Sequence, residues 1–508
     1  MEKAERDDSY PHILRYTGLF GGVQGLNIMV SLVRNKLVAM LLGPDGMGLV
    51  SLFNSTLKLL SDTTNLGIPM SGVKNVSEAY DQGDRERLLH TVRLIRSWSL
   101  FTGLVGMLLC IVLGPFFSRW TFSWGDHTLH FILLSPVVLL TAVSGGEFAI
   151  LKGTRQLKHL AFISLLNVVA ALVLTVPLYY FWWQQAIVPS IIIMALSQLV
   201  ITIVYSYRLF PFSVTFGRKQ LHEGVGMIRL GTAFVLAGFL GSGADFLIRC
   251  YMNYTTNLME VGLFNAGYMM TMTYAGMVFS AMETDYFPRL SAIMGCGPQL
   301  NQVVNRQIEV CLLLVAPLLV LFMVFLPILL PLLYSGKFMP VADMMRLTLL
   351  AMYFRAISLP IEYIALSKGD SKAYLFVEAV GDVMVVGLVI AGFSVAGLTG
   401  TGYGLALSGL LNLVFVVGFT RFRYGYLPSR SVRLYMLLLF PIGLLACVAC
   451  LLLTGWLYWA AGIALSACSL ALSLRILHSK THLWDKLTAK MRRIRQRGRR
   501  GGPTETDA

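Results

Sequence analysis

Apolar segments long enough to cross a bilayer follow one another along almost the whole chain. One membrane-spanning helix needs roughly 20 mostly apolar residues, and about fourteen segments meet that requirement. Hydrophobic residues make up 56% of the 508 residues and charged residues only 13%, a composition that excludes a soluble core. The sequence therefore predicts an all-α polytopic membrane protein.

The predicted spans differ in how sharply they are separated. A hinge at Gly455 alone divides the last two, so twelve spans followed by one long bent helix is an alternative. The polar residues 1–10 contain no cleavable signal peptide, so we expect the first span to remain in the bundle. The expected spans lie near residues 14–42, 48–72, 93–114, 129–151, 159–181, 186–207, 227–250, 260–286, 308–333, 343–366, 373–393, 401–420, 433–454 and 456–476.

Lys and Arg residues are concentrated in every second connection, and this distribution predicts the orientation of the protein in the membrane. Basic residues hold short connections in the cytoplasm, and every second connection is basic, such as those with Arg85, Lys152 and Lys368. The only lysine or arginine residues in the intervening connections are Arg119 and Lys337. We therefore expect both termini in the cytoplasm.

A stretch of the first half of the chain returns in the second. The segment GPDGMGLVSLFN from Gly43 has its counterpart in EVGLFNAGYMM from Glu260, and each follows an apolar segment that carries a basic residue. Arg34 precedes Gly48 by nearly the same interval as Arg249 precedes Gly262, in the same direction. Internal repeats of this kind build many transporters, with the substrate path between the halves.

Ionisable residues inside the predicted spans are candidate functional residues. Each costs roughly 2.5 to 3.5 kcal/mol at a helix centre on insertion scales, which implies a wet cavity or a partner. Arg34 and Lys36 are two residues apart and therefore point in different directions on a helix. The remaining candidates include i,i+4 pairs that share a helix face: Lys58 with Asp62, Asp245 with Arg249, and Glu378 with Asp382, followed by Glu283, Asp285, and Arg355 with Glu362.

Two interpretations of these charges stay open. In the first they line a cavity, where Arg and Lys bind an anion such as pyrophosphate and the acids take up a proton or sodium ion. In the second they are interhelical contacts that satisfy one another within the bundle. Residues near span ends are expected to extend to the interface instead; these are Lys74, Glu78, Glu147 and Lys152.

Several other classes of protein lack support in the sequence. The seven cysteines lie mostly in apolar spans and read as packing residues, Cys447 and Cys450 included. No nucleophile elbow, P-loop or His cluster with metal-ligand spacing occurs, so neither an enzyme nor a cofactor is expected. Much of the net charge of +15 lies in the tail from Arg475 to Arg500, which suits anionic lipid headgroups rather than nucleic acid.

Four sequence elements, in order, resemble those of a known transporter family. They are LLGPDGMGLVSLF with GVKNVSEAYDQGD, Arg249 with its downstream Glu260–Val261–Gly262, LLYSGKFMPVADMMRLTLLAMYFRAI, and IALSKGDSKAYLFVEAVGD. Together they cover most of residues 14 to 425. The chain is similar to the polysaccharide transporter family, specifically the O-antigen and enterobacterial-common-antigen lipid-linked oligosaccharide flippases of the multidrug/oligosaccharidyl-lipid/polysaccharide (MOP) superfamily.

The resemblance implies a fold of two pseudo-symmetric six-helix lobes around a central cationic cavity. The lobes would comprise residues 1–208 and 227–425, joined by a cytoplasmic linker at 209–226. An extra pair of helices at 426–476 and a basic cytoplasmic tail at 477–508 would follow. The family places basic residues at the positions of Lys36 and Arg249, so the resemblance assigns phosphate binding to those two; Arg34 and Lys58 join them from their location in the spans.

The resemblance also implies a function in the bacterial inner membrane. The expected substrate is an undecaprenyl-pyrophosphate-linked oligosaccharide, moved from the cytoplasmic to the periplasmic leaflet by alternating access, with proton or sodium coupling. Membrane lipids and polysaccharide polymerase or chain-length machinery are the expected partners, and no nucleic acid is. The alternatives are a multidrug and toxin exporter, a peptidoglycan-precursor (lipid II) flippase, and a structural subunit of a glycan-assembly complex.

Overall fold

The computed structural model describes residues 9–122, 125–215, 218–276, 279, 286–287, 289–293, 295 and 297–481. Helices account for nearly all of these residues, and no strand occurs among them. The chain is a multi-pass membrane protein, because ten described helical stretches are long and apolar enough to cross a bilayer. The basic tail beyond Thr481 lies outside the described residues.

Three of those ten stretches each contain two successive spans. Helix α1 (Ser9–Thr64) is broken at Gly43, whose φ of 66° is left-handed and which precedes Pro44. Helix α12 (Ser371–Tyr424) is broken at Ala396 and Gly397. The third stretch joins α5 (Leu157–Trp182), the 3₁₀ turn η1 (Trp183–Ala186) and α6 (Ile187–Leu209). With α8 (Leu258–Met269), which opens the segment expected at 260–286, about fourteen spans are confirmed.

The remaining helices follow the predicted order. They are α2 (Ile68–Asp81), α3 (Arg85–Thr121), α4 (Thr128–Gly153), α7 (Arg218–Thr255), the π-helical turn η2 (Met270–Ala275), α10 (Pro298–Leu333), the 3₁₀ turn η3 (Gly336–Val341), α11 (Ala342–Ser367), α13 (Arg430–Leu452) and α14 (Gly455–Thr481). Gly455 has a φ of 61° and separates α13 from α14. The alternative of one long bent helix at the end is therefore wrong.

Local chemistry explains where individual helices begin and end. The carboxylate of Asp84 caps α3 by accepting from the N–H groups of Glu86 and Arg87, at 3.0 and 3.1 Å. Such caps satisfy N–H groups that have no partner in the first turn. The second span ends at Thr64 rather than near residue 72, because Leu66 and Gly67 are left-handed and α2 begins directly after them, with Pro69 in its first turn.

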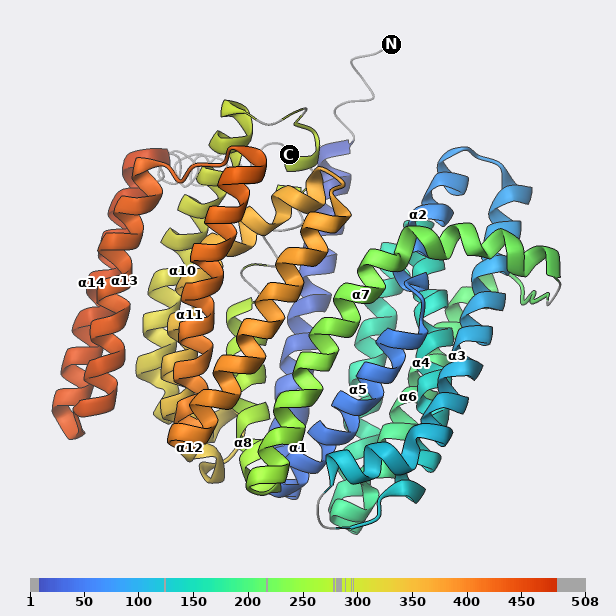
Figure 1. Cartoon of the computed structure of the whole chain (residues 1–508), viewed down its shortest axis with the longest axis horizontal. Helices are drawn as coiled ribbons and strands as arrows, with labels where there is room; N and C mark the ends of the chain where they lie inside the picture. Colours follow the sequence, from blue (N-terminus) through green and yellow to red (C-terminus); the bar gives the residue numbers. More distant parts are fainter. Residues whose placement is uncertain are drawn as a thin grey trace, which may run out of the picture. The chain divides into compact units, whose positions relative to one another are not determined.

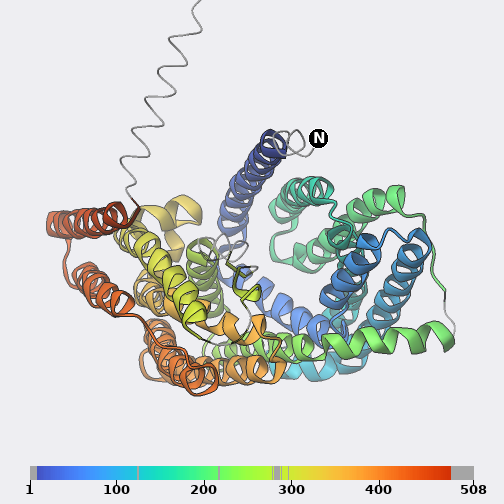
Figure 2. The same cartoon turned by 90° about the horizontal axis from the view of Figure 1, so that it is seen from above.

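The chain divides into two compact units. Unit 1 comprises residues 1–269, 327–344 and 369–408. Within it α4 packs against α2, α3 and α6, while α1 packs against α5, α7 and α8. These neighbours are visible in Figure 1, and the blue to teal helices α3 to α6 lie beside one another when seen end on in Figure 2.

The repeated segments meet inside unit 1. Gly48 of α1 and Gly262 of α8, the matching glycines of the two copies, lie backbone to backbone. A Cβ atom on Gly48 would lie 2.1 Å from the carbonyl oxygen of Leu258, and one on Gly262 would lie 1.8 Å from that of Pro44. Only glycine permits this approach, so α1 and α8 cross at the matching glycines of the repeat.

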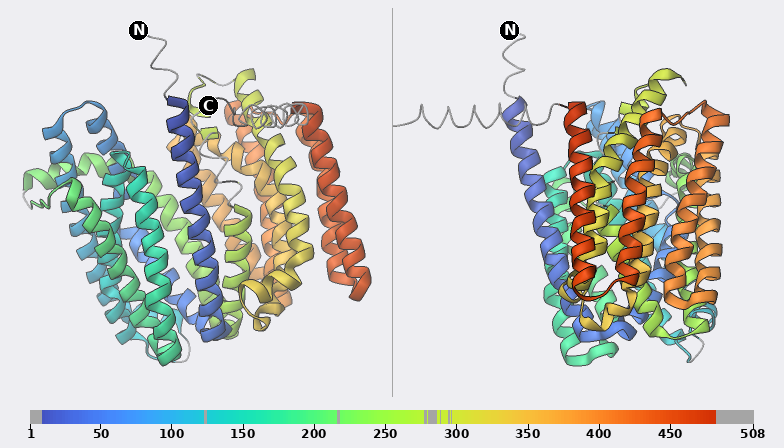
Figure 3. Two further views of the ribbon diagram at one scale, coloured as in Figure 1. Left: turned by 180° about the vertical axis from the view of Figure 1, so that it is seen from behind. Right: turned by 90° about the vertical axis from the view of Figure 1, so that its left-hand side faces the viewer.

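Unit 2 comprises residues 270–326, 345–368 and 409–508. Its helices α13 and α14 pack against each other, as the red helices in Figure 3 show. Val320 and Val324 of α10 form a core cluster with Ala446, Cys450 and Tyr458. The Tyr458 hydroxyl also donates to the carbonyl oxygen of Val324 at 2.7 Å. The extra pair of helices is therefore part of the core of unit 2.

Candidate functional site

Arg249 lies at the crossing of α1 and α8 and is enclosed by acceptors. Its Nε donates to Ser51 Oγ at 2.8 Å and its Nη2 to Asn265 Oδ1 at 3.2 Å. Nη1 forms an ion pair with Asp245 at 3.1 Å and also donates to the Asp245 carbonyl oxygen at 2.9 Å. Only 4% of Arg249 is exposed. The predicted i,i+4 pair with Asp245 is confirmed, and the guanidinium joins three helices.

Three carboxylates of unit 1 lie on α7 or against it. Asp245 is on α7 itself, and Asp382 of α12 lies close to it, with Oδ2 3.9 Å from where a Cβ on Gly241 would be. Oδ2 of Asp382 is buried and has no hydrogen-bond partner among the described residues. Asp62 of α1 lies near Ser242 and near Lys58 of its own helix. Glycines on α7 thus leave room for acids from α1 and α12.

Arg34 and Lys36 point away from each other, as their spacing predicts. Lys36 Nζ donates to the carbonyl oxygen of Pro331 in the last turn of α10, where carbonyl groups have no helical donor. Arg34 is half-buried and directs Nη2 to the sulfur of Met194 in α6 at 3.4 Å. Its Nε is buried without a partner, and no carboxylate of the described residues pairs with it.

The other predicted residues fall into three situations. Lys58 is exposed. Glu362 of α11, in unit 2, accepts from Asn412 Nδ2 at 2.9 Å, while Arg355 is exposed. Glu283 and Asp285 lie outside the described residues. No group of three or more His, Cys, Asp or Glu suited to a metal occurs in the part of the chain that the structure describes.

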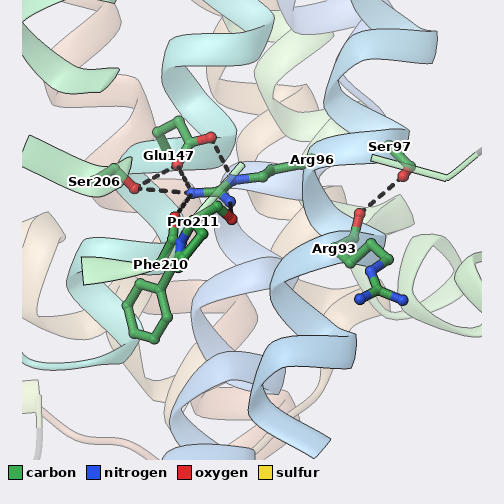
Figure 4. A network of polar contacts seen from close by, with 7 residues as sticks. All are labelled: Arg93, Arg96, Ser97, Glu147, Ser206, Phe210 and Pro211. Carbon is green, nitrogen blue, oxygen red and sulfur yellow. Dashed lines mark hydrogen bonds and ion pairs between the residues drawn. The ribbon is translucent and has the colours of Figure 1, made fainter. Parts of the chain in front are cut away.

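An ion pair of Arg96 and Glu147 was not predicted. Figure 4 shows Arg96 of α3 directed at Glu147 of α4, with Nε 2.7 Å from Oε1. The same guanidinium donates to the carbonyl oxygens of Phe210 and Pro211, at 3.1 and 2.8 Å. Ser206 of α6 donates to Glu147 Oε2. The network ties α3, α4 and α6 to the connection that leads to α7.

Glu147 corrects one expectation from the sequence. Its position near a span end predicted a side chain that extends to the interface, yet it is only 1% exposed. The cause is Arg96, which lies 51 residues earlier and neutralises it. Lys74 and Glu78 are exposed as expected, with 60% and 52% of their side chains accessible.

Solved structures with the same fold are transporters of the MOP superfamily. The lipid II flippase MurJ, in an inward closed conformation, matches with a TM-score of 0.71 at 11% identity, over 91% of this chain and 99% of that one. An inward-facing multidrug resistance MATE family transporter matches with a TM-score of 0.63 at 16% identity, over 79% and 94%. At these identities the likeness shows the fold alone.

A third structure has the same fold and a different described pocket. It is a MOP superfamily transporter from Pyrococcus furiosus, whose reversed binding-pocket polarity was taken to indicate a different function. It matches with a TM-score of 0.57 at 15% identity, over 80% of this chain and 93% of that one. No curated protein matches the chain.

The family itself is shown by the sequence. Residues 13–294, more than half of the chain, match the family described as polysaccharide biosynthesis protein. This region contains both copies of the repeat and the charged residues Arg34, Lys36, Arg96 and Arg249. The chain belongs to the polysaccharide biosynthesis protein family and has the fold of the MOP superfamily transporters.

Proposed function

We propose that the protein is a flippase for an undecaprenyl-pyrophosphate-linked oligosaccharide in the bacterial inner membrane. A sugar headgroup cannot enter hydrocarbon unsheltered, whereas a polyprenyl tail can remain in it. The proposed movement is from the cytoplasmic to the periplasmic leaflet by alternating access, with both termini in the cytoplasm. Membership of the family supports the glycan substrate class.

The observation that carries the proposal is the state of Arg34. It is a half-buried cation on a membrane-spanning helix, with a buried Nε that has no partner and with no carboxylate among the described residues to neutralise it. An unneutralised guanidinium is costly in a membrane and offers two parallel donors to a phosphate. A pyrophosphate would satisfy both its charge and its unused donor.

The other predicted cations are already engaged. Arg249 has three acceptors around it and Lys36 caps the end of α10. In this conformation they contribute less to phosphate binding than Arg34. A rearrangement that frees Lys36 from Pro331 would add a second cation.

Asp382 is the acid that we propose for ion coupling. Its Oδ2 is unpaired, and the nearest carboxylate, Asp245, is held by Arg249. Two carboxylates side by side favour uptake of one cation. A proton or a sodium ion bound at Asp382 would reduce the electrostatic repulsion between the carboxylates of Asp382 and Asp245.

Two other functions of the same fold are distinguishable by substrate. The match to MurJ covers nearly the whole of both chains and favours lipid II as the second candidate. A cation exporter, as in multidrug transporters, would not need the unneutralised Arg34. A purely structural role in a glycan-assembly complex predicts that loss of Arg34 has no effect on transport.

The test is flipping of a fluorescent undecaprenyl-pyrophosphate oligosaccharide in proteoliposomes. Arg34→Gln should slow flipping roughly tenfold or more, the equivalent of one charge-assisted hydrogen bond, and Arg34→Lys should retain part of the rate. Arg155→Gln, at an arginine that is 64% exposed and paired with Asp81, is the matched control. Full activity of Arg34→Gln would refute its role, and a parent that flips only lipid II would refute the substrate.

A further inference from the structure

A cavity opens in unit 1 where α1 is broken. Its volume is about 370 Å³, and its lining includes Met40, Pro44, Asp45, Trp183, Met259 and Lys337. These residues come from the break in α1, from η1, from the first turn of α8, which follows the α7–α8 connection, and from η3. The distribution of basic residues predicts all four connections on the outer side. The cavity therefore belongs to the end of unit 1 that is expected to face the periplasm.

Unused hydrogen-bonding groups surround the cavity. Asp45 and Lys337 are both exposed, and neither forms an ion pair with a described residue. Pro44 has no N–H group, so the carbonyl group of Met40, four residues earlier, lacks the donor that an unbroken helix supplies. The cavity thus offers acceptors on one element and an ammonium donor on another.

Trp183 adds an aromatic face in a strained conformation. Its φ of 49° and ψ of −129° are unusual for a bulky residue, and its N–H group donates to the carbonyl oxygen of Tyr179 at the end of α5. The residue is 67% exposed. Strained backbone of this kind concentrates at ligand sites. An interfacial anchor needs no such conformation, and the neighbouring Trp182 is 55% exposed without lining the cavity.

We infer that this cavity binds one sugar ring of the translocated oligosaccharide at the outer end of unit 1, an inference that rests on the proposed function. The C–H face of a pyranose would stack on the indole of Trp183. Its hydroxyl groups would donate to Asp45 and to the Met40 carbonyl group and accept from Lys337. A mixed set of one cation, one carboxylate and one aromatic ring suits a polyhydroxyl ligand better than a phosphate or a hydrocarbon tail.

The size of the cavity agrees with this ligand. Small-molecule sites usually measure roughly 300 to 1,000 Å³ and combine apolar lining with a few polar groups. At about 370 Å³ the cavity is at the lower end of this range. A cavity of this size holds one sugar ring, so the rest of the oligosaccharide would extend beyond it.

The test compares two probes that differ only in the sugar. Binding of the full-length protein is measured with undecaprenyl-pyrophosphate-linked oligosaccharide purified from the host cells and with undecaprenyl pyrophosphate that carries no sugar. Trp183→Ala should weaken binding of the first roughly tenfold or more, as expected for loss of a packed aromatic contact, and leave the second unchanged. Lys337→Gln should act in the same direction, and Trp182→Ala, the matched control, should affect neither.

Each outcome decides between explanations. Equal loss for both probes, or the same loss in Trp182→Ala, would make Trp183 an interfacial anchor and overturn the inference. Unchanged binding in both Trp183→Ala and Lys337→Gln would also overturn it while leaving the proposed function intact. Lys337 is exposed, so its variant tests the site even where Trp183→Ala misfolds. A parent that binds neither probe would refute the proposed substrate, and the sugar site with it.

Discussion

Gly48 and Gly262, matching positions of an internal repeat, bring the backbones of α1 and α8 into direct contact. A Cβ atom on either glycine would lie within 3.1 Å of the backbone nitrogen of the other. Ser51 and Asn265, three residues beyond each glycine, both accept hydrogen bonds from Arg249. The repeat therefore encodes a packed and hydrogen-bonded crossing within unit 1.

Replacing either glycine should destabilise the protein. Gly48→Ala and Gly262→Ala each place a methyl group against backbone atoms that cannot move aside, at a cost of about 2 kcal/mol or more. Gly243→Ala is the control, because its Cβ would meet only Leu59 Cδ1 at 3.9 Å; it should change stability by less than about 1 kcal/mol. Thermal unfolding in detergent measures all three. Equal midpoints for Gly48→Ala and Gly243→Ala would contradict the crossing.

Arg249 should be required for the stability of the fold rather than directly for transport. Arg249→Gln leaves Asp245 without its partner. Removing one member of a buried pair costs about 3–5 kcal/mol, and because the Asp245 side chain is 29% exposed, the cost here should lie at the lower end of that range. Arg249→Lys should not rescue stability, because one ammonium cannot reach three separate acceptors. The exposed Arg355 provides the control Arg355→Gln. A stable but inactive Arg249→Gln protein would instead place Arg249 at the substrate.

Arg96 and Glu147 should show strong coupling in a double-mutant cycle. Arg96→Met and Glu147→Leu each leave one buried charge unpaired, and each should lower stability by about 3–5 kcal/mol. The double variant removes both charges, so its loss should be smaller than the sum of the single losses. Melting temperatures of the four proteins measure this. Additive losses would show that the two side chains act independently.

Asp382→Asn should abolish coupling and leave binding intact. The amide keeps the shape of the carboxylate but takes up neither a proton nor a sodium ion. Flipping is measured in proteoliposomes with an imposed proton or sodium gradient and without one. The gradient that stimulates the parent should not stimulate the variant. Undiminished stimulation would move the coupling site to another acid, and Asp62→Asn is the comparison to make next.

Acidification should loosen the connection between α3 and α4. Burial lowers the pKa of His127, so the folded protein binds this proton less readily than the unfolded chain does, and stability falls as pH drops below about 6.5. Hydrogen bonds from Thr128 lower the pKa of Asp126, which adds to the loss at still lower pH. Amide hydrogen exchange of residues 125–131, corrected for intrinsic rates, should rise between pH 7.5 and pH 5.5. His127→Gln should reduce this rise, whereas the exposed His90→Gln should not.

The sequence predicts the spans well because each one is a local property. Residue composition over about 20 positions determines a membrane helix, and Gly43, Gly397 and Gly455 mark breaks through their left-handed φ values. The i,i+4 pairing of Asp245 with Arg249 follows from helix geometry in the same way. Helix ends are less local: Thr64 ends α1 because of a turn at Leu66 and Gly67 that the apolar pattern does not show.

Contacts between distant residues are what the sequence does not reveal. Nothing near Glu147 indicates that Arg96 will neutralise it, since the two are brought together only by the packing of α3 on α4. Lys36 is similar, because its acceptor Pro331 lies 295 residues away. The difference between an engaged Arg249 and an unneutralised Arg34 likewise depends on partners from several helices. Both read alike in the sequence, as basic residues within apolar spans.

The glycines of α13 and α14 make the extra helices traceable across relatives. The hydroxyl oxygen of Tyr353 would lie 2.5 Å from a Cβ on Gly443, and a methyl group of Val324 would lie 2.6 Å from one on Gly462. A relative without these two helices would expose the same ring and methyl groups to lipid, where nothing restrains their size. Gly443 with Tyr353, and Gly462 with Val324, should therefore change together among homologues that keep the pair of helices, whereas the positions of Tyr353 and Val324 should vary freely among homologues that lack it.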